Sequence, residues 1–135
     1  MNQFIAHITL LVSDYYDAIK FYTEILNFDL IEDTTINETK RWVLIRPKGA
    51  VECCLLLAKA ANVEQNSRIG DQTGGRVHLF LYTDFLYTDN FWRDYHQMVL
   101  KGLNFVRPPK TESYGTVAVF KDLYGNLWDL IERSS

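Results

Sequence analysis

The chain has 135 residues, with 14 Lys and Arg against 17 Asp and Glu, which gives a formal net charge of −3 and a sequence pI near 5.5. It is 47% hydrophobic and 23% charged, as in an ordinary globular domain, and the lack of a basic excess excludes binding to nucleic acid by bulk phosphate attraction. No apolar run approaches the roughly 20 residues that span a bilayer, and no secretory signal is visible at the N-terminus, so we expect neither nucleic acid nor membrane as a partner.

The first half of the sequence predicts a strand, a helix and three further strands. Phe4 to Val12 is apolar and rich in β-formers, and Ser13-Asp14 after it suits a helix N-cap. Apolar residues at spacings of three and four predict a helix over Tyr15 to Leu26. The three strands that follow are expected over Phe28 to Asp33, Arg41 to Pro47 and Glu52 to Ala58.

The second half repeats this plan after a polar, glycine-containing stretch over residues 62–75, which is expected to be a linker. A strand is predicted over Arg76 to Thr83 and an amphipathic helix over Asp89 to Lys101, with Gly102 after its end. Three more strands are expected, separated by Pro108-Pro109 and by a Tyr124-Gly125 turn, over Leu103 to Arg107, Thr116 to Lys121 and Asn126 to Glu132.

Residue matches between the halves support an internal duplication. The stretch from His7 resembles the stretch from His78, 71 residues later, and the stretch from Trp42 corresponds to the one from Val117, 75 residues later. Each half alone buries too little surface to be stable, so the halves are expected to share one α+β domain. Its parts are module one, residues 1–60, a linker, 61–75, and module two, 76–135.

The paired histidines and one aspartate are the candidate metal ligands. His7 and His78 lie at equivalent places in the two halves, and a neutral imidazole binds Zn, Ni, Fe or Mn well. Asp129 lies among apolar residues, where a carboxylate needs a cationic partner, either a metal ion or an arginine (Arg41 or Arg107). The alternative for each histidine is a hydrogen-bonded core residue.

A fourth ligand is less clear from the sequence. Subtracting the 75-residue offset from Asp129 gives Cys54, and Glu52 shares its face of the predicted strand. One more residue in the turn would shift the match to Cys53, and Cys54 as a plain core residue is the alternative. A disulfide between two adjacent cysteines is strained, so they indicate the reducing cytoplasm.

Two motifs resemble the vicinal oxygen chelate superfamily, which includes glyoxalase I, bleomycin-resistance proteins, fosfomycin-resistance enzymes and extradiol dioxygenases. They are the helix end Phe21-Tyr22 with Leu26 and Phe28, and the C-terminal stretch from Tyr114 through Phe120-Lys121-Asp122 and Gly125-Asn126 to Ile131. The resemblance covers residues 4–133. It implies two βαβββ modules that form a curved mixed sheet around a cleft (the glyoxalase-like fold) and assembly as a homodimer.

The resemblance also implies a metal site and an activity. The metal ligands of the family fall on His7, His78 and Asp129, whereas the position of its remaining glutamate is occupied by Cys54 or a neighbour such as Glu52. One divalent ion (Zn, Ni, Fe or Mn) is implied, or none, and Asp129 would also move a proton. The expected function is a small metal-dependent lyase or isomerase that acts on a small molecule with adjacent oxygens, because dioxygenases of the family are typically longer.

The alternative function is a metal-free protein of the bleomycin-resistance type that sequesters a planar or hydrophobic small molecule. Aromatic side chains at Trp42, Tyr82 and Tyr114 would stack on such a ligand, and Arg41 would meet an anionic group. Each aromatic residue has a plainer alternative role in the core or at a dimer contact, and the alternative for Arg41 is an ordinary surface cation. The metal content of the purified protein separates the two functions.

Overall fold

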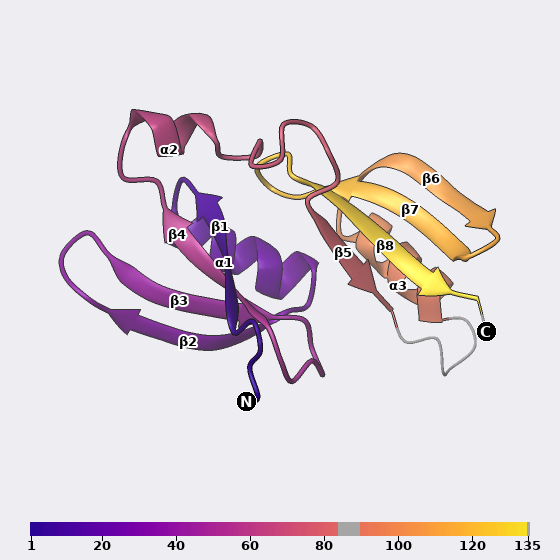
Figure 1. Ribbon diagram of the computed structural model, residues 1–135. Helices are drawn as coiled ribbons and strands as arrows, with labels where there is room; N and C mark the ends of the chain where they lie inside the picture. The colour runs from indigo at the N-terminus through magenta and orange to yellow at the C-terminus, as the bar shows by residue number, and fades with distance from the viewer. Residues whose placement is uncertain (84–89, 135) are drawn as a thin grey trace. The chain divides into compact units, whose positions relative to one another are not determined.

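The computed structural model of the chain describes residues 1–83 and 90–134 (Figure 1). The chain divides into two compact units, residues 1–69 (unit 1) and 70–135 (unit 2). Each unit contains one four-stranded mixed sheet, with a helix between its first and second strands. The predicted α+β fold of two βαβββ modules is therefore confirmed.

Unit 1 has the strand order β1-β4-β3-β2, with β1 parallel to β4 and the other pairs antiparallel. The predicted helix over Tyr15 to Leu26 is present as α1 followed by a wider π-helical turn, η1, in which the N–H of Leu26 donates to the carbonyl of Phe21 at 3.3 Å. The elements are β1 (His7–Val12), α1 (Tyr15–Lys20), η1 (Phe21–Ile25), β2 (Asp29–Thr35), β3 (Arg41–Arg46), β4 (Cys54–Lys59) and α2 (Val63–Ser67).

Unit 2 has the corresponding strand order β5-β8-β7-β6, with β5 parallel to β8 and the other pairs antiparallel. Its helix α3 packs on the sheet through Phe91, which is fully buried, and Met98. The elements are β5 (Leu79–Tyr82), α3 (Asn90–Leu100), β6 (Asn104–Glu112), β7 (Gly115–Lys121) and β8 (Leu127–Arg133).

In each unit one face of the sheet packs against the helix, and we call the other face the open face. In unit 1 the helix residues Ala18 and Tyr22 are fully buried, as are Leu10 and Val12 of β1. Because side chains alternate along a strand, His7 projects from the open face. In unit 2 Trp128 and Leu130 are buried on the helix side of β8, so Asp129 between them projects from the open face.

Three elements differ most from the sequence predictions, and the predicted helix start at Asp89 lies outside the described residues. Strand β5 begins at Leu79, so His78 lies just before the strand and not within it. Strand β6 continues through Pro108 and Pro109, which were expected to end it; β6 is an edge strand, where a residue without an N–H is tolerated, and the register shifts between Arg107 and Lys110. The stretch expected to be a linker contains the short helix α2.

Candidate functional site

The open face of unit 1 presents His7 beside Cys54 and close to Trp42. His7 and Cys54 are neighbours in the parallel register of β1 and β4, so their side chains leave the same face. The imidazole of His7 is exposed, whereas Cys54 is buried. The rings of His7 and Trp42 meet edge to face, with centroids 5.8 Å apart, although β4 lies between their strands. The predicted metal ligand of unit 1 therefore has an aromatic neighbour.

The open face of unit 2 presents Asp129 among apolar and basic side chains. Asp129 is the register neighbour of Phe80 on β5 and of Val119 on β7, and Val119 is paired in turn with Arg107 on β6. Burial raises the pKa of the Asp129 carboxyl above its ordinary value, and the positive charge of Arg107 opposes that rise. Of the two arginines proposed from the sequence as partners for Asp129, Arg107 is the one whose charge acts on it.

His78 lies just before β5 in unit 2 and lines a cavity that also contains basic residues. Its backbone N–H donates to the carbonyl of Leu127 at 2.8 Å, and its imidazole Nε2 is buried with no hydrogen-bond partner in the described structure. Burial lowers the pKa of the imidazole, and the negative charge of Asp122 opposes this shift. His78 also lines a cavity of about 210 Å³ together with Arg76 and Lys121, and no carboxylate is among its described lining residues.

The strand registers correct the internal match of Asp129. Phe80 pairs with Asp129 in unit 2, and the equivalent pair in unit 1 is Thr9 with Leu56. The antiparallel strand pairs agree. In unit 2 Val119 pairs with Asp129, and in unit 1 the residue equivalent to Val119, Leu44, pairs with Leu56. Leu56 and not Cys54 is thus the counterpart of Asp129. A leucine supplies no metal ligand at this position.

Within the described residues, no group of three or more His, Cys, Asp and Glu side chains is placed to hold a metal ion. The set expected from the sequence draws His7 from unit 1 and both His78 and Asp129 from unit 2. Neither unit alone therefore fits a metal, and a site built from both remains a prediction. Glu52, the other residue considered as a fourth ligand, is exposed in the loop before β4.

Unit 1 contains a cavity of about 710 Å³ at the end of the sheet where β3 begins and β4 ends. Trp42 and Arg41, both expected from the sequence to bind a ligand, line it. Its wall combines an apolar part with polar and basic side chains. The lining residues are Tyr15, Asn37, Thr39, Lys40, Arg41, Trp42, Leu56, Leu57, Ala58, Lys59, Ala60, Ala61 and Gln65. We call this space the unit 1 cavity.

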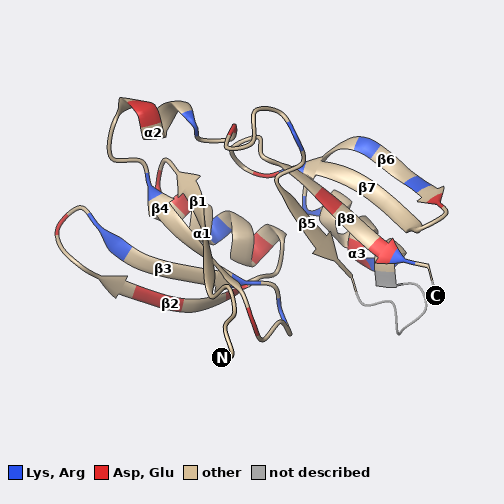
Figure 2. Cartoon of the chain, viewed as in Figure 1, with Lys and Arg blue, Asp and Glu red and all other residues tan. Residues whose placement is uncertain are grey.

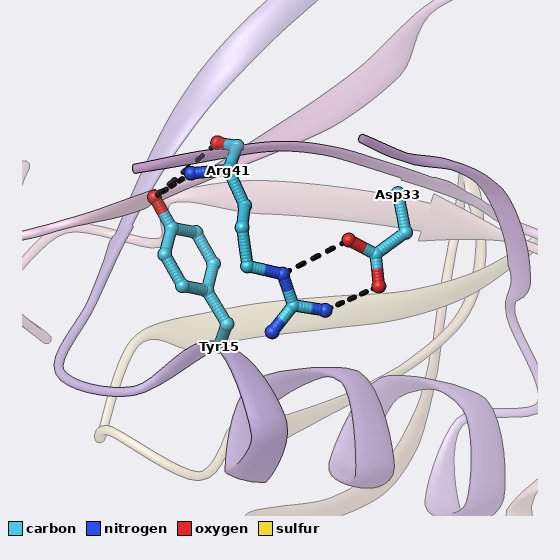
Figure 3. Close-up of polar contacts among 3 residues, drawn as sticks. All are labelled: Tyr15, Asp33 and Arg41. Atoms are coloured by element: carbon cyan, nitrogen blue, oxygen red, sulfur yellow. Dashed lines mark hydrogen bonds and ion pairs between the residues drawn. The ribbon is translucent and has the colours of Figure 1, made fainter. Parts of the chain in front are cut away.

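Arg41 is fixed in the wall of this cavity by Tyr15 and Asp33 (Figure 3). Its Nε donates to Asp33 Oδ1 at 3.0 Å, its Nη2 donates to Asp33 Oδ2, and its guanidinium lies 5.3 Å from the centroid of the Tyr15 ring. The Tyr15 hydroxyl contacts both the backbone N–H and the carbonyl of Arg41 at 3.3 Å. The hydrogen bond to Asp33 raises the pKa of Arg41. The charge of Arg41 is therefore already paired.

The other two expected stacking residues lie in unit 2, outside the unit 1 cavity. Tyr82 is the last residue of β5 and is 53% exposed, with the guanidinium of Arg133 at 5.1 Å from its ring centroid. Tyr114 is exposed in the turn between β6 and β7. Both side chains are accessible to a ligand or a partner chain.

Sequence reasoning missed the part of the cavity wall that follows β4. The side chain of Asn62 accepts from the N–H of Gln65 at 2.8 Å, and Gln65 Oε1 accepts from the N–H of Ala61 at 2.8 Å. Asn62 thus caps the start of α2, and the bond from Ala61 holds Gln65 in the wall. The signal was present in the sequence, as Asn followed three residues later by Gln.

No helix in the described part of the chain is long and apolar enough to cross a membrane.

Comparison with known proteins confirms the superfamily resemblance. Residues 4–130 match the Glyoxalase/Bleomycin resistance protein/Dioxygenase superfamily. A protein of Shewanella frigidimarina (strain NCIMB 400), described as uncharacterized, is 56% identical over 133 residues, which are 98% of this chain and 95% of that protein. The crystal structure of UcmS2 is 31% identical with a TM-score of 0.80, covering 97% of this chain and 98% of that chain. TnmS3, an antibiotic binding protein from Streptomyces sp. CB03234, is 27% identical with a TM-score of 0.76, covering 98% of each chain.

Proposed function

This chain belongs to the Glyoxalase/Bleomycin resistance protein/Dioxygenase superfamily, and on that premise we propose that it binds an aromatic small molecule without converting it. The observation that carries the proposal is the cavity of about 710 Å³ in unit 1, with Trp42 in its wall. Small-molecule sites in proteins typically enclose about 300–1,000 Å³, so the space suits a ligand of two or more fused rings.

The wall of the unit 1 cavity has the character of a site for an aromatic ligand. Leu56, Ala58 and Ala60 supply apolar surface, and the half-buried indole of Trp42 supplies a π-face. An aromatic pair contributes about 0.5–1.5 kcal/mol beyond the area that it buries. The stacking partner and the apolar surface lie together in one unit, so the proposal requires no particular arrangement of the two units.

One comparison and one feature of the strand register support binding. TnmS3 is described as an antibiotic binding protein, and its similarity extends over 98% of each chain. Leu56 occupies the place in unit 1 that matches Asp129, so this place supplies no metal ligand from unit 1. We therefore rank a binding protein above the metal-dependent lyase or isomerase that the sequence favoured.

The binding proposal is tested by NMR titration with naphthalene-2-carboxamide, a planar neutral probe. The chain has three tryptophans, and the indole N–H resonance of Trp42 is identified by its absence in Trp42→Phe. We expect the probe to shift this resonance and to be recovered chemically unchanged. Followed through the backbone amide resonances, Trp42→Ala should show no binding, whereas Trp92→Ala, on the exposed surface of α3, should bind as wild type does. Equal binding by wild type and Trp42→Ala argues against the site.

A metal-dependent activity is the second candidate, and the buried, unpartnered Nε2 of His78 favours it. His7, His78 and Asp129 would hold the ion, which would polarise adjacent oxygens of a substrate as a Lewis acid. Elemental analysis of the untagged protein tests this function. Stoichiometric metal that is lost in His7→Ala, His78→Ala and Asp129→Ala supports it, and metal that stays bound in those variants refutes this ligand set.

We also propose a cytoplasmic homodimer. Cys53 and Cys54 are free thiols, as expected in a reducing compartment. Large apolar side chains are exposed in both units, and a second copy of the chain would bury them; they include Phe4, Ile5, Ile8, Phe80 and Tyr82. Light scattering after size-exclusion chromatography should give twice the chain mass of 15.8 kDa, and a monomer at micromolar concentration contradicts the dimer.

A further inference from the structure

The unit 1 cavity is lined by positive charge and by hydrogen-bond donors, and we infer that its ligand is an aromatic acid, an anion at neutral pH. The inference rests on the proposed binding function and adds the charge of the ligand to it. Lys40 and Lys59 line the cavity, and no Asp or Glu is among its described lining residues. Basic residues gather at the start of β3 and at the end of β4, the two strand ends that border the cavity (Figure 2).

The two lysines, and not the arginine, supply the charge that is available to a ligand. Both oxygens of Asp33 accept hydrogen bonds from the guanidinium of Arg41, and the carboxylate thereby neutralises the charge of Arg41. Within residues 1–83 and 90–134, neither Lys40 nor Lys59 forms an ion pair. A cavity whose lining combines apolar residues with two lysines outside any ion pair attracts a ligand that combines a ring system with a negative charge.

The backbone places both lysines firmly. The carbonyl of Lys40 accepts from the N–H groups of Ile36 and Asn37 at 2.9 and 3.1 Å, which closes the hairpin between β2 and β3. Lys59 is paired with Val12 in the register of β4 and β1, and the next N–H, of Ala60, donates to the carbonyl of Val12 at 3.0 Å. The backbone of each lysine is therefore fixed at the strand ends that border the cavity.

The two amide side chains in the wall also favour an anion, because each oxygen already accepts hydrogen bonds from the backbone. Asn37 Oδ1 accepts from the N–H groups of Thr39 and Lys40, each at 3.0 Å, and from the Thr39 hydroxyl at 3.2 Å. Gln65 Oε1 accepts from the N–H of Ala61 at 2.8 Å. With its oxygen fully occupied, Asn37 can offer a ligand its NH₂ group, which only donates. Gln65 offers its NH₂ group and one remaining lone pair of Oε1.

Three naphthalene probes of equal ring size test the charge. Naphthalene-2-carboxylate is an anion, naphthalene-2-carboxamide is neutral, and 2-naphthylmethylammonium is a cation. The Trp42 indole resonance reports binding of each. At about 0.1 M salt, where the Debye length is about 10 Å, we expect the carboxylate to bind roughly fivefold more tightly than the carboxamide, and we expect this ratio to approach one near 1 M salt. The ammonium probe should bind more weakly than the carboxamide.

Variants assign the preference to the two lysines. In the double variant Lys40→Gln/Lys59→Gln, the carboxylate should lose its advantage while the carboxamide binds as it does to wild type. The control is Lys48→Gln, which removes a lysine that is paired with Asp29 and lies beyond the opposite end of β3, roughly 20 Å along the strand from the cavity. This control should retain the fivefold preference.

The outcomes separate the inference from the function on which it rests. If carboxamide and carboxylate bind equally to wild type, or if the preference survives the double lysine change, the charge assignment is overturned while the aromatic binding site stands. If none of the probes moves the Trp42 resonance at millimolar concentration, the proposed function is overturned and the charge assignment with it. A salt-sensitive preference that is lost only in the lysine variant supports both.

Discussion

Asp122 organises the turn between β7 and β8, and we expect Asp122→Ala to lower the free energy of unfolding by about 3–5 kcal/mol. The carboxylate is 6% exposed. Its Oδ1 accepts from the N–H groups of Tyr124 and Asn126, each at 3.0 Å. Its Oδ2 accepts from Asn126 Nδ2 at 2.8 Å and from the indole N–H of Trp128 at 3.2 Å. This network gives the Asp122 to Asn126 motif of the family a structural role.

The size of the effect follows from which donors lose their acceptor. Asn126 and Trp128 are 2% and 3% exposed, so their side-chain donors cannot turn to water. A buried donor without a partner costs about 1–3 kcal/mol, and the two backbone N–H groups in the turn add to the loss. Asp122→Asn keeps one oxygen but places an NH₂ group against two donors, so its cost should approach that of Asp122→Ala.

Urea unfolding followed by circular dichroism measures the loss, and the indole N–H resonance of Trp128 reports the local change. We expect both variants to shift that resonance and to unfold at clearly lower urea concentration with an unchanged slope. A conservative control is Lys121→Gln, an exposed neighbour that contributes no bond to the turn. An Asp122→Ala variant within about 1 kcal/mol of wild type refutes the reasoning, because donors that are buried and unpaired cannot cost so little.

Three further changes test other parts of the structure. Burial lowers the folded-state pKa of His78, so the stability that its neutral imidazole contributes is complete above about pH 6.5 and is lost as the pH falls toward the folded-state pKa. With a chelator present to remove metal ions, His78→Gln should therefore lose less free energy of unfolding than wild type on acidification. Parallel losses in the two proteins contradict this. Gly115→Ala places a Cβ 2.1 Å from a backbone oxygen of β8, so its melting temperature should fall well below that of Gly49→Ala, which meets nothing within 4 Å; equal melting temperatures count against a tight approach of β7 to β8. Tyr15→Phe removes the hydroxyl that joins α1 to the backbone of Arg41 and should lower the free energy of unfolding by about 1 kcal/mol, and an unchanged value in urea unfolding speaks against that contact.

Most elements of the fold could be predicted from the sequence because local patterns specify them. The spacing of apolar residues gave the helix after Asp14, and the repeated order of elements gave two equivalent modules. The prediction that the strand after α3 ends before Pro108 and Pro109 was wrong. Whether a strand can continue through proline depends on its lying at the edge of the sheet, which is a tertiary property that the sequence of one strand does not encode.

The candidate site was less accessible to sequence reasoning because it depends on register. The connection from β3 to β4 covers residues 47–53, and the one from β7 to β8 covers 122–126, so the first is two residues longer. This difference shifts the counterpart of Asp129 from Cys54 to Leu56. Only hydrogen-bonded pairing reveals such a shift, because both residues are apolar enough for a buried strand.

Titration calorimetry of the chelator-treated protein with naphthalene-2-carboxylate tests most directly whether the chain binds an aromatic ligand without a metal ion. We expect one ligand per chain, the same affinity before and after chelation, and no binding by Trp42→Ala. Binding that disappears on chelation and returns when zinc is added would show that a metal ion holds the ligand, and the unit 1 cavity would then not be the primary site.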